Sequence, residues 1–229
     1  MKIKTGISGF DALVDGGFPK GRTVLLSGMP GTGKTIFALQ FIYNGATQFK
    51  EKGLYISLEE NADSLKRQAA LFGLNLEQPE KEGLLRIVEI PAKNITERTA
   101  KEIIQMAQKG NYTRLVIDSL STLAINTPTL GPISDITEIA IKRFIYHFIH
   151  ELRGEVTSLL ISHSLHGELS GDKVSEFVCD GIIHITSDAV GGDYSRSLII
   201  KKMREVKHDE DIHALEISKK GIVIHALKD

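Results

Sequence analysis

Short runs of apolar residues alternate with longer segments in which apolar residues recur every three or four positions. The longer segments have the period of an α-helix with one buried face, as residues 135–152 show. Helices are therefore predicted at 34–49, 61–72, 95–108 and 135–152. The short apolar runs are rich in Val, Ile and Leu, and they predict strands at 23–28, 54–59, 85–90, 114–119, 157–163, 181–187, 196–203 and 221–226.

This alternation predicts an α/β fold with a mostly parallel central sheet, because strands of continuous Val, Ile and Leu need helices over both faces. After about residue 180 the helical segments stop and short strands follow closely. The change predicts an antiparallel C-terminal extension on one edge of the sheet. No linker, repeat or low-complexity tract interrupts the chain, so one domain over residues 1–229 is expected.

Composition narrows the class of protein. With 41% hydrophobic and 25% charged residues, the 229-residue chain can bury a large core, and disorder is not expected. A net charge of -1 provides no dominant attraction for nucleic acid. No apolar run is long enough for a membrane span, and residues 1–4 do not open a signal peptide. The single cysteine, Cys179, excludes an internal disulfide and is typical of the cytoplasm, where we expect the protein.

A glycine-rich segment directly after strand 23–28 matches the phosphate-binding loop, or Walker A motif. Its glycines let backbone N–H groups face a phosphate, and the helix that follows adds its positive end. Lys34 can reach the terminal phosphates and the Thr35 hydroxyl can bind Mg²⁺. An ordinary glycine turn would not need this strand–loop–helix context. The residues predicted to contact a nucleoside triphosphate are Gly28, Met29, Pro30, Gly31, Thr32, Gly33, Lys34, Thr35 and Ile36.

Asp118 ends the buried strand 114–119 and is predicted to hold Mg²⁺ through water, beside Thr35. An acidic turn residue is the alternative interpretation of Asp118. The histidine pairs His147/His150 and His163/His166 lack a convincing set of further ligands and are interpreted as ordinary histidines. Magnesium is therefore the only metal predicted.

Two glutamates end the strand 54–59. A carboxylate at this edge could orient and deprotonate the water that attacks a γ-phosphate. Adjacent residues of a strand point to opposite faces, so Glu59 and Glu60 should differ in role, and Glu59 is the favoured base. The alternative is that the pair caps helix 61–72.

Lys202 and Arg204 are two residues apart, so on a strand they share a face and can address one anion. On a far edge of the sheet they could reach the phosphate loop of an adjacent copy. From the residues alone, a solvated basic edge strand is the favoured interpretation.

These motifs together resemble the KaiC-like branch of the RecA superfamily of ATPases. The resemblance extends over nearly the whole chain, and the segments that carry it are Thr5–Asp11, Gly16–Gly21, Ile56–Glu60, Phe72–Leu74, Glu176–Ile183 and Lys202–Arg204. It implies a RecA-like P-loop NTPase fold. It also implies a Mg²⁺-dependent ATPase, a hydrolase acting on acid anhydrides, with Glu59 and Glu60 as its paired catalytic glutamates.

The resemblance further implies a homo-oligomer, usually a ring of six subunits, with ATP between neighbours. Lys202 and Arg204 would then contact the γ-phosphate of the adjacent subunit, and His208 would lie near the same nucleotide. This reverses the interpretation favoured from the residues alone. Such a ring would act as a regulatory or signalling switch toward an unknown protein partner.

The chain also departs from the family pattern. Glu205-Val206 follow the basic pair where Gly and Ser or Thr are usual, and Ser218-Lys219 replace a Thr-Asp type pair near the adenine. Glu176-Phe177 occupy the positions at which the circadian clock protein of this family carries a phosphorylated Ser-Thr pair. Clock function and autophosphorylation at that site are therefore not predicted.

Two alternative functions stay open. A recombinase paralogue would bind DNA through loops 126–134 and 164–175, but these loops hold one basic residue, Lys173. Ser162-His163-Ser164 also lacks the Asn-Gln pair of recombinases. DNA binding is therefore possible but not favoured. The other alternative, a nucleotide-dependent scaffold that does not hydrolyse ATP, is opposed by the presence of Glu59, Asp118 and the basic pair.

Overall fold

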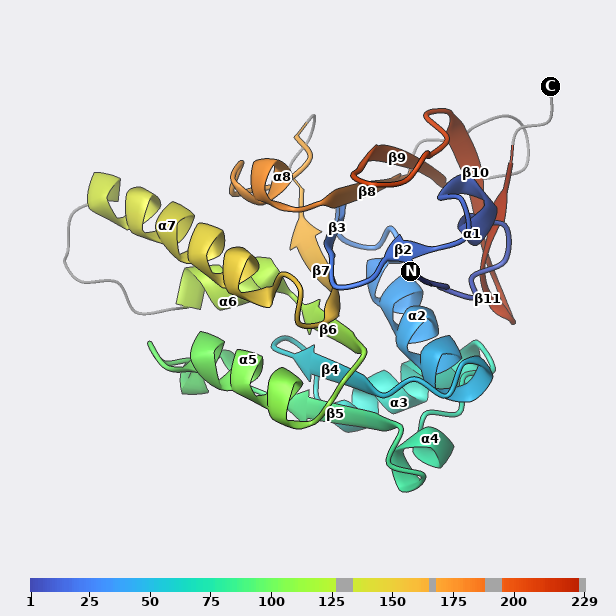
Figure 1. The fold of residues 1–229 in the computed structure, drawn as a ribbon, viewed down its shortest axis with the longest axis horizontal. Helices are drawn as coiled ribbons and strands as arrows, with labels where there is room; N and C mark the ends of the chain where they lie inside the picture. The colour runs from blue at the N-terminus through green and yellow to red at the C-terminus, as the bar shows by residue number, and fades with distance from the viewer. Residues whose placement is uncertain (127–133, 165–167, 188–194, 227–229) are drawn as a thin grey trace.

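A nine-stranded sheet forms the centre of the computed structural model, which describes residues 1–126, 134–164, 168–187 and 195–226 (Figure 1). Its strand order is β11-β10-β9-β8-β3-β7-β6-β4-β5. The strands are β3 (Thr23–Gly28), β4 (Gly53–Ser57), β5 (Leu85–Glu89), β6 (Arg114–Asp118), β7 (Thr157–His163), β8 (Gly181–Thr186), β9 (Ser197–Met203), β10 (Ile212–Ser218) and β11 (Gly221–His225). The strands from β8 to β5 in this order are parallel, and β9, β10 and β11 continue the sheet in antiparallel pairs. The predicted fold class is confirmed.

Helices cover both faces of the parallel strands because successive strand residues are apolar on both sides. Val24 and Leu26 of β3 pack in the core that contains the long helix after the phosphate loop, whereas Leu25 packs in the opposite core. Figure 1 shows α5, α6 and α7 on one side of the sheet and α2 on the other. The helices are α1 (Phe10–Leu13), α2 (Lys34–Gln48), α3 (Ala62–Leu71), α4 (Glu77–Lys81), the 3₁₀ turn η1 (Ala92–Asn94), α5 (Thr99–Lys109), α6 (Leu120–Asn126), α7 (Ser134–Leu152) and α8 (Ser175–Val178).

The N-terminal segment packs beside β11, the edge strand of the large sheet. Strands β1 (Lys2–Ile3) and β2 (Phe18–Pro19) form a two-stranded antiparallel sheet, and Ser8 bridges to β11. Gly9 follows this bridge with a φ of 80°, and a Cβ there would lie 1.9 Å from the Ile224 carbonyl oxygen. Only glycine permits this close approach of the two backbones.

Several predicted boundaries were wrong. Strand β4 ends at Ser57, so Glu59 and Glu60 lie in a loop, and the alternation of strand residues does not separate their roles. Helix α5 begins at Thr99, and 95–98 are not helical. The pattern also missed β10, because its mixed sequence Ile-His-Ala-Leu-Glu-Ile-Ser alternates weakly. Strand β9 has β8 on one side and β10 on the other, so it is not the edge strand that was expected.

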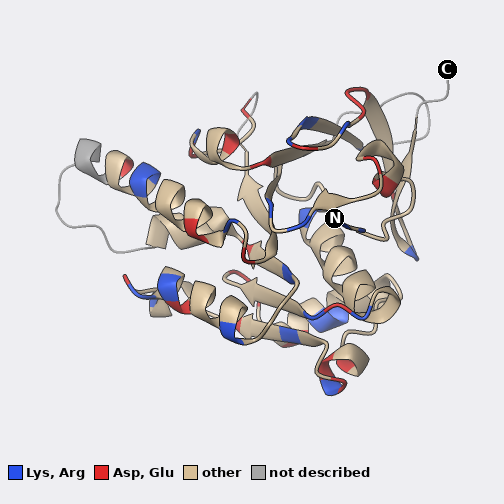
Figure 2. Ribbon diagram, viewed as in Figure 1, with Lys and Arg blue, Asp and Glu red and all other residues tan. Residues whose placement is uncertain are grey.

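Charged residues lie mainly on the helices and connections, and the central strands are almost free of them (Figure 2). Basic and acidic positions are interspersed, in keeping with the net charge of -1. None of the helices that the structure describes combines the length and the apolar composition of a membrane-spanning segment.

Candidate functional site

The phosphate loop connects β3 to α2 at the carboxyl edge of the parallel strands. Its glycines have positive φ angles, 155° at Gly28, 80° at Gly31 and 104° at Gly33, which a side chain would disfavour. At Gly28 a Cβ would lie 2.4 Å from the Ile185 carbonyl oxygen. Helix α2 begins at Lys34, directly after the loop, so its unpaired N–H groups and positive end are available to an anion.

Lys34 lies across the loop that precedes it. Its ammonium group donates hydrogen bonds of 2.8 Å to the carbonyl oxygens of Gly28 and Met29. The side chain is 5% exposed, and this burial lowers the pKa of Lys34 to about 8. Asp118 and Glu59 act against this lowering through their negative charge, and a phosphate at the loop would add a further counter-charge to the buried ammonium group.

The predicted magnesium residues lie together. Thr35 donates through Oγ1 to Asp118 Oδ2 at 3.0 Å, and the Tyr55 hydroxyl donates to the same oxygen at 2.6 Å. Burial raises the pKa of Asp118. A hydroxyl and a carboxylate oxygen suit Mg²⁺, which usually takes its other ligands from phosphates and water. Among the described residues no group of three or more His, Cys, Asp or Glu could hold a metal by itself.

Glu59 is held by side chains from the ends of β6 and β7 and from helix α6. Its Oε1 accepts hydrogen bonds from Ser119 Oγ, from Thr122 Oγ1 at 2.6 Å and from His163 Nε2 at 3.0 Å. The hydrogen bond from His163, followed by those from Ser119 and Thr122, lowers the pKa of Glu59 to about 2. Glu59 is therefore an anion at neutral pH.

Glu60 has different contacts. Its Oε2 accepts a hydrogen bond of 2.8 Å from Ser64 Oγ on α3. The N-cap of α3 is Asn61, whose side chain accepts from the Ser64 N–H at 2.8 Å. The capping role that was the alternative for the two glutamates thus belongs to Asn61.

The phosphate loop, the two glutamates and Asp118 line one cavity of about 610 Å³. Gly28, Met29 and Thr32 belong to the same loop but do not line the cavity; Thr32 Oγ1 donates to Met29 O at 2.9 Å. The lining residues are Pro30, Gly31, Gly33, Lys34, Thr35, Ile36, Glu59, Glu60, Gln68, Phe72, Asp118, Ile161, His163, Arg196 and Ile217.

Sequence reasoning missed Arg196, His163 and Gln68 as members of this cavity. Arg196 has a buried Nε without a hydrogen-bond partner among the described residues. Because β9 runs antiparallel to β8, the residue before β9 lies at the same edge of the sheet as the phosphate loop. A basic residue directly before an antiparallel strand was the signal that could have identified it.

The basic pair lies away from this cavity. Met203 pairs with Gly181, which pairs with Val24, so Lys202 and Arg204 lie toward the amino end of β3. The Lys202 ammonium group donates to the carbonyl oxygens of Glu176, Phe177 and Cys179 at 3.1, 3.3 and 2.7 Å. Arg204 donates to Asp180 Oδ1 at 3.3 Å. His208, in the connection from β9 to β10, does not line the cavity either.

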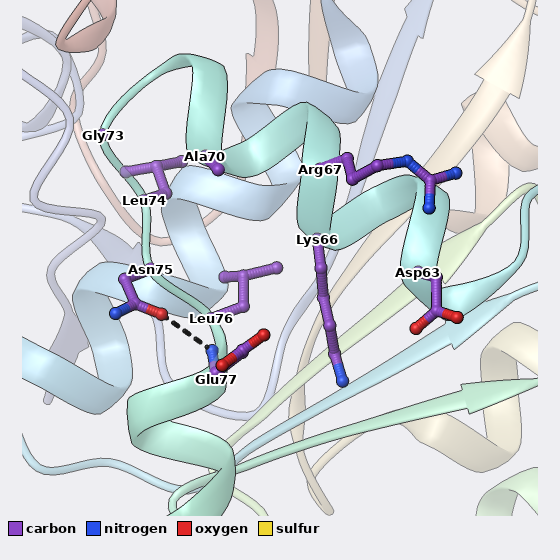
Figure 3. A pocket seen from close by; sticks show the side chains of 9 residues that line it. All are labelled: Asp63, Lys66, Arg67, Ala70, Gly73, Leu74, Asn75, Leu76 and Glu77. Atoms are coloured by element: carbon purple, nitrogen blue, oxygen red, sulfur yellow. Dashed lines mark hydrogen bonds between the residues drawn. The ribbon is translucent and has the colours of Figure 1, made fainter.

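Other cavities lie elsewhere. One of about 530 Å³ is formed by α3 and the segment that leads to α4, and none of the predicted site residues lines it (Figure 3). Another of about 660 Å³, between α6, α7 and the segment after β7, shares His163 with the phosphate-loop cavity. Most of the predicted DNA-binding loop 126–134, and part of loop 164–175 with His166, fall outside the described residues.

Comparisons with known proteins agree with this geometry. A model of the family described as "ATPase: KaiC" matches residues 3–229. A UPF0273 protein of Thermotoga maritima is 36% identical, over 98% of this chain and 96% of that protein, and a UPF0273 protein of Pyrococcus furiosus is 34% identical, over 98% and 94%.

A solved structure gives the same result. The crystal structure of KaiC-like protein PH0186 from Pyrococcus horikoshii is similar to this structure, with a TM-score of 0.82 and a sequence identity of 35%. The match covers 99% of this chain and 99% of that chain. The family match spans almost the entire chain, and the strand order places a phosphate loop where this fold binds its ligand. The chain therefore belongs to the KaiC-like ATPases of the RecA superfamily.

Proposed function

We propose that the protein binds ATP with Mg²⁺ and hydrolyses it. The observation that carries this proposal is the presence of Lys34, Asp118 and an ionised Glu59 in one cavity with the phosphate loop. The loop amides and Lys34 would bind the β- and γ-phosphates. Thr35 and Asp118 would hold Mg²⁺, which neutralises charge that develops on the phosphate oxygens.

Glu59 would act as the general base. A water that attacks the γ-phosphorus loses a proton to the Glu59 carboxylate, while the bond from the γ-phosphorus to the bridging oxygen breaks and leaves ADP. Glu60, whose Oε2 is bound by Ser64, would support the loop that presents Glu59. Arg196, with its unpartnered Nε in the cavity wall, would bind a phosphate oxygen.

We further propose that residues 1–229 work as one domain within a homo-oligomer, with a six-membered ring as the expected form. Lys202 and Arg204 would contact the γ-phosphate of the adjacent subunit, with His208 nearby. Support comes from their place toward the amino end of β3, away from the phosphate loop of their own chain. A head-to-tail contact of this kind closes into a ring or continues as a filament.

The resulting assembly would serve as a regulatory nucleotide switch that passes its state to a protein partner. Its location in the cytoplasm stays a prediction from the single buried cysteine, Cys179.

Glu59→Gln tests the proposed hydrolysis. The amide keeps the size of the side chain but cannot take a proton, so phosphate release from Mg²⁺-ATP should fall by a factor of about 100 or more. Binding of ADP, measured by calorimetry, should be unchanged because the loop and Lys34 remain. Glu155→Gln, an exposed glutamate before β7, is the matched control and should behave like the parent. Parent-like turnover by Glu59→Gln would reject Glu59 as the base.

A further inference from the structure

The three hydrogen bonds to Glu59 all reach the same oxygen. Ser119, Thr122 and His163 each contact Oε1, and within the described residues Oε2 has no hydrogen-bond partner. The carboxylate is thus fixed in orientation by one oxygen while the other oxygen is left open. A carboxylate that must receive a proton from a water needs this arrangement, because the accepting oxygen has to be unoccupied and aimed.

Of these three partners, His163 is the one with an imidazole ring, and its contacts decide which ring nitrogen carries a hydrogen. An ionised carboxylate only accepts hydrogen bonds, so His163 Nε2 must carry the hydrogen. Nδ1 is buried without a hydrogen-bond partner among the described residues. An Nδ1–H would be left unpaired there, so both nitrogens favour a hydrogen on Nε2 over a tautomer with the hydrogen on Nδ1 alone.

The backbone of His163 is anchored on both sides of the residue. Its N–H donates to Ser121 Oγ at 3.1 Å, and its carbonyl oxygen accepts from Gly171 N–H at 3.1 Å. The next N–H, that of Ser164, donates to the carbonyl oxygen of Gly28 at 3.2 Å. The imidazole is therefore tied through the backbone to the start of the phosphate loop, which Lys34 also contacts at Gly28.

We propose that His163 is a positioning residue for Glu59, whose Oε1 it holds through Nε2–H so that Oε2 faces the attacking water. The inference rests on the proposed function, because positioning of a base matters only if ATP is hydrolysed. It adds a residue that sequence reasoning interpreted as an ordinary histidine. Thr122 and Ser119 share the task, but only His163 comes from β7, the strand next to the phosphate-loop strand β3.

Steady-state kinetics of three variants tests the inference. His163→Ala should lower kcat for Mg²⁺-ATP about tenfold, with KM unchanged, because two hydroxyls still hold Glu59 but its orientation is loosened. His163→Gln should recover most of kcat, since its amide can donate to Oε1. His147→Ala, an exposed histidine on α7, is the control and should match the parent. A parent-like kcat in His163→Ala, or no recovery in His163→Gln, would overturn the inference.

A spectroscopic measurement is independent of turnover. Two-bond ¹H–¹⁵N NMR of the imidazole should show His163 as the Nε2–H form in the parent, and the hydrogen-bonded Nε2–H signal should be lost in Glu59→Ala. An Nδ1–H form would overturn the inference, because Nε2 could not then donate to a carboxylate. A parent protein that leaves Mg²⁺-ATP intact would instead reject the proposed function, so the two failures are distinguishable.

Discussion

At the scale of single residues, burial lowers the pKa of Lys34, and hydrogen bonds lower the pKa of Glu59 close by. Lys34 is almost completely buried, and its pKa falls to about 8. Glu59 accepts hydrogen bonds from His163, Ser119 and Thr122, and its pKa falls to about 2. The ammonium group is thus the group whose charge responds to a nearby anion, whereas the carboxylate stays ionised throughout the physiological range.

This difference predicts a pH dependence of nucleotide binding. A bound phosphate favours the charged form of Lys34 and raises its pKa in the complex. The affinity for ADP should then be constant below pH 8 and fall as pH rises above 8, by up to about tenfold per pH unit. Calorimetry at several pH values measures this. In Lys34→Ala the affinity should be weaker and nearly independent of pH over this range. A flat profile in the parent would contradict the prediction.

At the scale of elements, a buried arginine joins three parts of the chain. Arg114 begins β6 and is fully buried. It donates to Phe41 O on α2 at 2.7 Å, to Lys4 O at 2.6 Å and to Glu51 Oε2 at 2.7 Å. Its guanidinium also lies 4.6 Å from the centre of the Phe41 ring. Helix α2 with the connection after it, the N-terminal segment and the sheet are thereby held in one arrangement.

Arg114→Ala should therefore destabilise the fold strongly. It leaves the buried Phe41 carbonyl group, the partly buried Lys4 carbonyl group and Glu51 without this partner and opens a cavity, which together should cost about 3–5 kcal/mol in the free energy of unfolding. Denaturant unfolding measures this. Arg86→Ala, an exposed arginine on β5, is the matched control and should change the free energy of unfolding by less than about 0.5 kcal/mol. An equal effect of the two substitutions would contradict the assigned role of Arg114.

At the scale of the whole molecule, the sheet separates the phosphate loop from the basic pair. The loop follows the carboxyl end of β3, whereas Lys202 and Arg204 lie toward its amino end. Arg204 is half exposed, and its contacts with Asp180 Oδ1 and the Phe177 carbonyl oxygen leave other N–H donors for a second molecule. Lys202, with three carbonyl acceptors, would have to exchange them to contact a phosphate.

Mixed assemblies test the proposed action between subunits. Lys34→Ala and Arg204→Ala should each be nearly inactive alone. In an equal mixture, an Arg204→Ala subunit with a Lys34→Ala neighbour forms one intact site, so turnover should recover to about a quarter of the parent value. Lys34→Ala mixed with Glu59→Gln should recover nothing, because both changes affect the same side of a site. No recovery in the first mixture, once subunit exchange is verified, would contradict action in trans.

The sequence by itself determined the parallel core, the antiparallel extension and the residues of the phosphate loop. These features rest on local patterns, namely strand-length apolar runs and glycines at fixed spacing, which are readable without knowing what lies across the sheet. The pairing of Thr35 with Asp118 also followed, because the ends of parallel strands meet at one edge.

Only the tertiary structure decided which side chains surround the two glutamates. Three features depend on strand order or on contacts between residues 60 or more positions apart. They are the end of β4 at Ser57, the contact of His163 with Glu59 and the place of Arg196 in the cavity. The interior position of β9 depends on β10, whose weak alternation hides it. Local patterns carry no record of such pairings, since these are set by how the strands and helices pack against one another.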